Sequence, residues 1–232
     1  HDRLDDKAFA NISNHSAWLR SSHLARQLAY YELFKQTIDT PGSIIEFGTW
    51  RGSNYFFLGR LIDIFCNDAH ETVKLTTKKL YGFDTFKGLA GISDKDQSSN
   101  TAHDQRKNGG LSFDINIFQE AQIHFRKDCA QAWRANTISG NVLDTWPTFL
   151  AENTGLKISM LILDMDIYAP TKCILDTVYP YLSKGACIVF DDYGYEEWPG
   201  ATKAADEFID RYSLRLQRFN WSYGPGAYTF LQ

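Results

Sequence analysis

Short apolar runs alternate with helix-periodic segments, and this alternation most constrains the fold of the chain. Residues 43–47 form an apolar run that ends at a glycine, and residues 53–65 then place apolar side chains at steps of three and four. The first pattern predicts a buried strand and the second an amphipathic helix. The alternation recurs, with strands expected at residues 80–83, 137–139, 158–163 and 186–190, and helices at residues 23–39, 115–125, 146–151, 170–181 and 201–212.

Strands separated by helices pair in parallel, because right-handed crossovers place the helices on the faces of the sheet. We therefore expect a doubly wound α/β fold with a mostly parallel, Rossmann-like sheet. Residues 214–219 and 227–231 are both strand-like, with a glycine- and proline-containing turn at 224–226, which predicts a C-terminal antiparallel hairpin. The length of 232 residues fits one domain over residues 41–232, preceded by a helical segment, residues 1–40, for a lid or for oligomerisation.

Composition narrows the classes of partner. There are 24 Lys and Arg against 28 Asp and Glu, without a dense basic tract, so nucleic acid is not expected as a partner. No apolar run reaches the roughly 20 residues that span a bilayer, and residues 1–10 are too charged for the apolar core of a signal peptide. The four cysteines lie far apart, which predicts reduced core thiols and a cytoplasmic protein.

Residues 87–112 form a polar stretch between predicted elements. Its Asp, Asn, Ser, Gly and Lys content predicts either a lid or a disordered loop, two alternatives that the sequence leaves even. His103 lies in this stretch and is a candidate base for a bound substrate, although a solvated loop histidine is the commoner case.

Ligands of such sheets bind beyond the carboxyl ends of the strands. Glu46 to Ser53 contains two glycines that allow a tight turn before a helix, and Asp84 and Thr85 follow the next strand, where a carboxylate can accept from a ribose diol. Together these two ends suggest an adenosine site. Gly140 and Asn141 follow the third strand and could border the base, although a capped turn is an equal alternative.

Two later strands each end in paired acids. Asp164 and Asp166 follow one buried strand, and Asp191 and Asp192 follow the next. Carboxylates that meet at one sheet edge repel unless a cation or protons intervene, and oxygen ligands suit Mg²⁺, Ca²⁺ or Mn²⁺ better than zinc. The alternative is that some of these acids cap the helices that follow.

Several motifs occur in an order that resembles the macrocin O-methyltransferase family. They are Ile45-Glu46-Phe47-Gly48-Thr49-Trp50-Arg51-Gly52-Ser53, Phe83-Asp84-Thr85-Phe86-Lys87-Gly88-Leu89, Asp144-Thr145-Trp146-Pro147, Leu163-Asp164-Met165-Asp166-Ile167-Tyr168-Ala169-Pro170-Thr171, Tyr179-Pro180-Tyr181-Leu182-Ser183-Lys184-Gly185-Ala186, and Asp191-Asp192-Tyr193 followed by Pro199-Gly200. The similarity covers residues 21–209.

The resemblance implies a class I methyltransferase fold and S-adenosylmethionine as cofactor. Its expected cofactor-binding residues are Glu46 and Gly48 at the methionine part, Asp84 at the ribose, and Ser53, Thr85, Gly140 and Asn141 around them. It also implies a Mg²⁺ site formed by Asp164, Asp191 and Asp192. Members of the family methylate sugar hydroxyls of natural products and are usually oligomeric, so a small-molecule hydroxyl acceptor and a homo-oligomer are expected.

The mechanism that follows is alignment of an acceptor oxygen behind an activated methyl group, with Mg²⁺ lowering the pKa of the hydroxyl. Asp164 or His103 would take the proton, whereas the lysine base of related catechol-type enzymes is excluded because Ile167 stands at its position. Two rivals are a haloacid-dehalogenase-like Mg²⁺-dependent phosphatase, whose acid pairs these strands imitate, and a non-catalytic nucleotide-sensing module.

Overall fold

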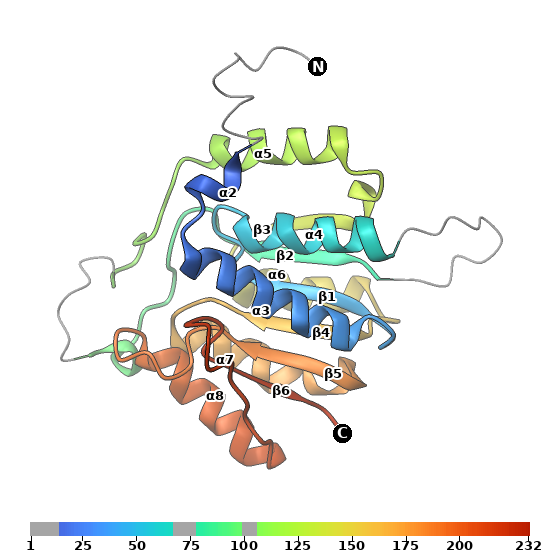
Figure 1. Ribbon diagram of the computed structural model, residues 1–232. Coiled ribbons are helices and arrows are strands. Elements are labelled where there is room, and N and C mark those ends of the chain that lie inside the picture. Colours follow the sequence, from blue (N-terminus) through green and yellow to red (C-terminus); the bar gives the residue numbers. More distant parts are fainter. Residues whose placement is uncertain (1–13, 67–77, 99–105) are drawn as a thin grey trace.

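The computed structural model describes residues 14–66, 78–98 and 106–232 (Figure 1). Within these ranges, one six-stranded sheet runs in the order β3-β2-β1-β4-β5-β6. Its neighbours are parallel except for the antiparallel pair β5 and β6. The strand bounds are β1 (Ser43–Phe47), β2 (Leu80–Asp84), β3 (Ala135–Ser139), β4 (Ile158–Leu163), β5 (Leu182–Phe190) and β6 (Ala227–Phe230). The predicted doubly wound, mostly parallel sheet is confirmed.

Helices cover both faces of the sheet (Figure 1). The first face carries α3 (Ser21–Thr37), α4 (Ser53–Phe65) and α5 (Ile115–Asp128). The second face carries α6 (Val142–Glu152), α7 (Tyr168–Thr177) and α8 (Pro199–Tyr212). Neighbouring residues of β1 alternate between the two cores, with Ile44 packed among the first set and Ile45 among the second. Burial on both faces explains why the central strands are continuous apolar runs.

Four short elements complete the described chain, namely α2 (His15–Trp18) and the 3₁₀ turns η1 (Asp94–Asp96), η2 (Ala132–Arg134) and η3 (Tyr179–Tyr181). The helix expected over residues 170–181 is in fact α7 followed by η3. Pro180 has no N–H to continue the helical ladder, so the chain tightens into a separate turn there.

The predicted C-terminal hairpin is wrong in its first strand. Residues 214–219 make one isolated antiparallel bridge, between Gln217 and Tyr228, instead of a ladder. At the next position, the Thr229 hydroxyl donates to the Arg215 carbonyl, so a side chain replaces the backbone pairing that would extend the bridge. β6 pairs with β5 along its other edge, and the expected antiparallel end of the sheet is confirmed.

The described parts of the polar stretch 87–112 are held in place by hydrogen bonds. Asp96 is buried and accepts from the backbone N–H of Tyr168 at 2.7 Å, which ties η1 to the start of α7. Leu89 and Gly110 are joined by a backbone hydrogen bond of 2.8 Å. Residues 99–105, which include His103, lie outside the described residues.

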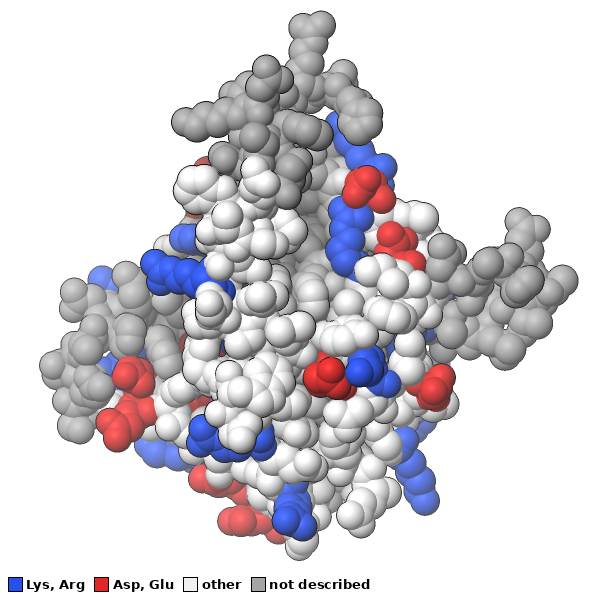
Figure 2. Space-filling view, viewed as in Figure 1, with Lys and Arg blue, Asp and Glu red and all other residues white. Residues whose placement is uncertain are grey.

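The cysteines, the charged surface and the hydropathy of the helices can be compared with what the composition predicts. Cys66, Cys129, Cys173 and Cys187 are all free thiols. Lys, Arg, Asp and Glu are interspersed on the face seen in Figure 2, with uncharged surface between them. In the ranges that the model describes, we find no helix with the length and hydropathy needed to cross a bilayer. The boundary at residue 40 between a helical segment and the domain stays a prediction.

Candidate functional site

The strand order reverses between β1 and β4, and this switch point positions the site. β2 lies on one side of β1 and β4 on the other, so the loops after β1 and β4 leave the sheet side by side. Gly48 has φ +91°, and a Cβ at this position would lie 1.6 Å from the carbonyl oxygen of Asp164. Only glycine permits so close an approach with this backbone. The glycine after the first strand therefore allows the two loops to pack directly against each other.

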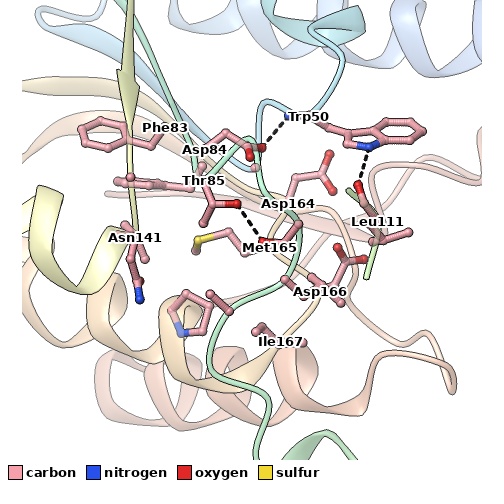
Figure 3. Close-up of a pocket in the computed structure, with 18 of the residues that line it drawn as sticks. Trp50, Phe83, Asp84, Thr85, Leu111, Asn141, Asp164, Met165, Asp166 and Ile167 are labelled. Carbon is pink, nitrogen blue, oxygen red and sulfur yellow. Dashed lines mark hydrogen bonds between the residues drawn. The ribbon is translucent and has the colours of Figure 1, made fainter. Parts of the chain in front are cut away.

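A cavity of about 270 Å³ opens beside this contact (Figure 3). Gly48, Asp84, Thr85, Gly140 and Asn141, five of the expected cofactor-binding residues, line it. Its apolar walls include Phe47, Trp50, Phe83, Leu89, Leu111, Phe113, Met165 and Pro170. The ends of β1, β2, β3 and β4 thus meet at one largely apolar cavity with a few polar groups, which is the usual composition of a small-molecule site.

Asp84 is held by backbone donors at the end of β2. The N–H groups of Trp50 and Phe86 donate to its two carboxylate oxygens at 2.6 Å and 2.7 Å. Burial raises the pKa of Asp84, and these hydrogen bonds oppose that shift. Each carboxylate oxygen keeps a second lone pair for a ligand. Asp84 is therefore fixed by the loop backbone and remains an acceptor on the cavity wall.

Trp50 closes the same side of the cavity. Its φ is +46°, its indole N–H donates to the Leu111 carbonyl at 3.0 Å, and its ring meets Phe113 edge-on at 6.3 Å (Figure 3). The loop after β1 is thereby joined to the end of the polar stretch. No sequence pattern singled out Trp50, because its role depends on a partner 61 residues away.

Asn141 caps a helix and also lines the cavity. Its side chain accepts from the N–H of Leu143 at 3.1 Å and so caps α6, while the residue also lines the cavity with Gly140. Thr85 lines the cavity as well, and its hydroxyl donates to the Gly88 carbonyl at 2.7 Å.

Glu46 and Ser53 are not among the residues that line the cavity. Ser53 is the exposed first residue of α4. Glu46 is buried, its Oε1 accepts from the Asn54 side-chain amide at 2.8 Å, and its Oε2 has no hydrogen-bond partner among the described residues. Burial raises the pKa of Glu46 to about 8. An unpartnered buried carboxylate oxygen of this kind fits the ammonium group of a bound ligand.

The predicted acids converge at the adjoining edge of β4 and β5. One carboxylate oxygen each from Asp164, Asp191 and Asp192, here called the acidic cluster, lie within 4.8 Å of one another. Asp164 also lines the cavity, so the two halves of the site share this residue. α7 and α8 receive no side-chain cap from their N-cap residues, Ile167 and Trp198, which removes the capping alternative for these acids.

Arg26 of α3 meets the acidic cluster from the first face of the sheet. Its two terminal nitrogens donate to Asp191 at 2.6 Å and to Asp164 at 2.8 Å, and the Tyr30 hydroxyl donates to the other oxygen of Asp191 at 2.9 Å. Sequence reasoning missed Arg26 and Tyr30. They lie one helical turn apart in a segment with the apolar period of a helix. Nothing in that segment indicates that the two side chains bind acids far along the chain.

Negative charge exceeds positive charge here. Burial, with like charge from neighbouring acids, raises the pKa of Asp164 and Asp192 despite Arg26. Asp166 lines the cavity with φ +62°, and its backbone N–H donates to Asp192 at 2.9 Å. Burial raises the pKa of Asp166 to about 8. Oxygen donors with surplus negative charge fit a hard divalent cation.

Comparisons with known proteins agree with this geometry. A family model described as macrocin-O-methyltransferase (TylF) matches residues 26–218. A mycinamicin III 3''-O-methyltransferase of Micromonospora griseorubida is 25% identical over 175 residues, covering 75% of this chain and 63% of that protein. An 8-demethyl-8-(2,3-dimethoxy-α-L-rhamnosyl)-tetracenomycin-C 4'-O-methyltransferase of Streptomyces olivaceus is 23% identical over 175 residues, covering 75% and 60%.

A solved structure is similar over nearly the whole chain. The crystal structure of CalS11, a calicheamicin methyltransferase, has a TM-score of 0.79 and 26% identity, and the match covers 95% of this chain and 83% of that one. By contrast, the chain covers less than two thirds of the length of the two curated relatives, at 63% and 60%.

Proposed function

Since the chain belongs to the macrocin-O-methyltransferase family, we propose that it is an S-adenosylmethionine-dependent, Mg²⁺-assisted O-methyltransferase that acts on a hydroxyl of a sugar or a glycosylated natural product. The observation that carries this proposal is the shared residue Asp164. It lines the cavity and belongs to the acidic cluster, so a methyl donor and an activated hydroxyl would meet at one point.

The cavity residues would hold the cofactor, which supplies an electrophilic methyl group when bound. Asp84 would accept from the ribose hydroxyls, because its carboxylate is fixed by two backbone N–H groups. Gly140 and Asn141 would border the base, and Trp50 would exclude water from the same side. Glu46 would pair with the ammonium group of the methionine part, with Gly48 giving the close backbone approach. Thr85, which lines the cavity, and Ser53, at the start of α4, stay predicted cofactor contacts from the sequence.

The acidic cluster would hold Mg²⁺ through Asp164, Asp191 and Asp192, and the ion would lower the pKa of the acceptor hydroxyl. Asp164 is the proton acceptor expected from the sequence, and Asp166 is a second carboxylate on the cavity wall. His103, the other candidate base, stays a prediction from the sequence. The group that acts as the base would take the hydroxyl proton as the oxygen attacks the methyl group, and would release it to solvent after the transfer.

The relatives support the class of acceptor. Their names specify a 3'' oxygen of mycinamicin III and a 4' oxygen of a rhamnosyl tetracenomycin C. We extend to this chain only the common chemistry, a hydroxyl of a glycosylated small molecule. A homo-oligomer in the cytoplasm is part of the same proposal.

The family match favours this function over the haloacid-dehalogenase-like phosphatase. The acids at the ends of β4 and β5 are only similar to the acid pairs of such a phosphatase. The nucleotide-sensing module differs from the enzyme in one property, since it would bind the cofactor and transfer nothing.

The test combines calorimetry with a turnover assay. S-adenosylhomocysteine is titrated into the protein with Mg²⁺ and with chelator, and binding in the micromolar range is expected in both buffers. Mycinamicin III and the demethylated rhamnosyl tetracenomycin then serve as trial acceptors, with methyl transfer followed by mass spectrometry. Mg²⁺-dependent transfer supports the enzyme. Binding without transfer across a panel of glycosides would favour the sensing module, and folded protein without binding would contradict both.

A further inference from the structure

Arg26 contacts the acidic cluster from α3, a helix with no residue among those that line the cavity. Its guanidinium lies 5.3 Å from the centre of the Tyr30 ring, and a Cβ added to Gly224 would come within 2.9 Å of the same group. The side chain is therefore enclosed between α3 and the segment before β6. Its side chain is 21% exposed, so solvent reaches one part of it.

Arg26 uses the oxygens that a metal ion would need. It binds Oδ2 of both Asp164 and Asp191, and Oδ1 of Asp191 already accepts from Tyr30. The Oδ2 of Asp192 instead accepts from the backbone N–H of Asp166. While Arg26 stays in place, a divalent cation that binds all three acids would have to share Asp164 and Asp191 with the guanidinium group. Two cations that share carboxylates repel in a partly buried site.

We propose that Arg26 is the resident counter-cation of the acidic cluster and competes with the divalent metal ion for Asp164 and Asp191. Arg26 balances part of the negative charge while the metal is absent, and metal binding releases it. The proposal rests on the Mg²⁺ site of the proposed function. It adds that Arg26, which is not a metal ligand, lowers the affinity of the site for the metal. It also adds that metal binding breaks the contacts of Arg26 between α3 and the ends of β4 and β5.

Release of Arg26 would weaken the attachment of α3 to the sheet. Arg26 and Tyr30 both bind Asp191, so α3 is anchored to the end of β5 by two polar contacts. Loss of the guanidinium contact leaves only the Tyr30 hydroxyl in place. We therefore expect the first half of α3 and residues 222–226 to open more often when the metal is bound.

The first test measures Mn²⁺ affinity from the electron paramagnetic resonance signal of the free ion. The protein variants are wild type, Arg26→Gln, Arg26→Lys and Lys35→Gln. Lys35 is the matched control, because it lies on the same helix in an exposed pair with Glu32. Arg26→Gln should bind Mn²⁺ about tenfold more tightly or better, since the competing charge is gone. Arg26→Lys should fall between, and Lys35→Gln should equal wild type.

Thermal unfolding gives a second readout from the same samples. In chelator, Arg26→Gln should melt roughly 5 °C or more below wild type, because the acids lose their partner. Mn²⁺ should raise its melting temperature by more than it raises that of wild type. If Arg26→Gln does not fold, hydrogen exchange of wild type decides the proposal. Added Mn²⁺ should speed exchange in the first half of α3, and unchanged or slower exchange there would overturn the release of Arg26.

The outcomes separate this proposal from the function on which it rests. Equal Mn²⁺ affinity in wild type and Arg26→Gln would overturn the competition and leave the metal site standing. Absence of Mn²⁺ binding from both proteins would overturn the competition and the Mg²⁺ assistance together. S-adenosylhomocysteine binding, measured on the same samples, reports separately on the cofactor cavity.

Discussion

The ends of β1, β2 and β3 are organised differently from the ends of β4 and β5. In the first region, polar side chains are held by backbone groups of nearby loops, as Asp84 is held by the N–H groups of Trp50 and Phe86. In the second region, acids are balanced by the side chain of Arg26, which is 138 residues from Asp164 and 165 from Asp191 in the sequence.

The cavity is preorganised by the backbone, whereas the acidic cluster depends on charge balance. Backbone donors keep their position whatever the charge of a ligand, so the cavity is ready for a cofactor. The acidic cluster depends on which cation is present, because its carboxylates repel without one. We therefore expect substitutions in the first region to change cofactor affinity, and substitutions in the second to change turnover and metal response.

Gly48→Ala should have the largest effect, because Gly48 joins the two regions. The added Cβ would lie 1.6 Å from the carbonyl oxygen of Asp164 at φ +91°. We expect a loss of roughly 3 kcal/mol or more in the free energy of unfolding, measured by denaturant titration. Gly155→Ala is the control, because nothing lies within 4 Å of its added Cβ, and it should cost less than about 1 kcal/mol. Equal costs would mean that the loops can part freely.

Asp191→Asn should have the next largest effect, and mainly on turnover. Asp191 belongs to the acidic cluster but does not line the cavity. We expect kcat to fall roughly a hundredfold or more, while the Kd for S-adenosylhomocysteine changes by less than about threefold. Asp210→Asn, an exposed acid of α8, should leave both unchanged. A comparable loss of turnover and cofactor affinity would make Asp191 a structural acid for both regions.

The same contrast explains what the sequence could predict. The parallel strands, Gly48, Asp84 and the paired acids follow from local patterns, because each motif lies directly after an apolar run. Arg26 and Trp50 were missed, because their roles come from partners far along the chain. Residues 214–219 make a single bridge instead of a strand for a related reason, since the Thr229 hydroxyl binds the Arg215 carbonyl, a contact that no local pattern shows.

Asp84→Asn should weaken cofactor binding by roughly ten- to a hundredfold, measured by calorimetry with S-adenosylhomocysteine. An amide nitrogen cannot accept from the N–H of Trp50 or Phe86, so one of these donors loses its partner and the carboxylate for the ribose is lost. The control is Asp144→Asn, an exposed acid in the first turn of α6. Unchanged affinity in Asp84→Asn would remove Asp84 from the cofactor site.

Glu46→Gln should have the smallest effect on affinity, about fivefold, and a distinct proton signature. The pKa of Glu46 is raised to about 8 by burial, so the carboxyl is mostly protonated at pH 7 in the free protein. Pairing with a ligand ammonium group favours the charged form and releases a proton. Calorimetry of S-adenosylhomocysteine binding in phosphate and in Tris should therefore detect up to about one released proton for wild type at pH 7. Glu46→Gln should release none, and equal release by both proteins would place the ammonium group elsewhere.

The same substitution should change how stability depends on pH. The folded-state pKa of Glu46 lies above its value of 4.5 in the unfolded chain, so between these two values the folded protein binds more protons. Stability from this group is complete below about pH 4.5 and declines as the pH rises through 8. Glu46→Gln removes that decline, so its free energy of unfolding should match wild type near about pH 4 and exceed it near about pH 9. Parallel curves for the two proteins would mean that Glu46 is already ionised at pH 7, and the proton release would then have another source.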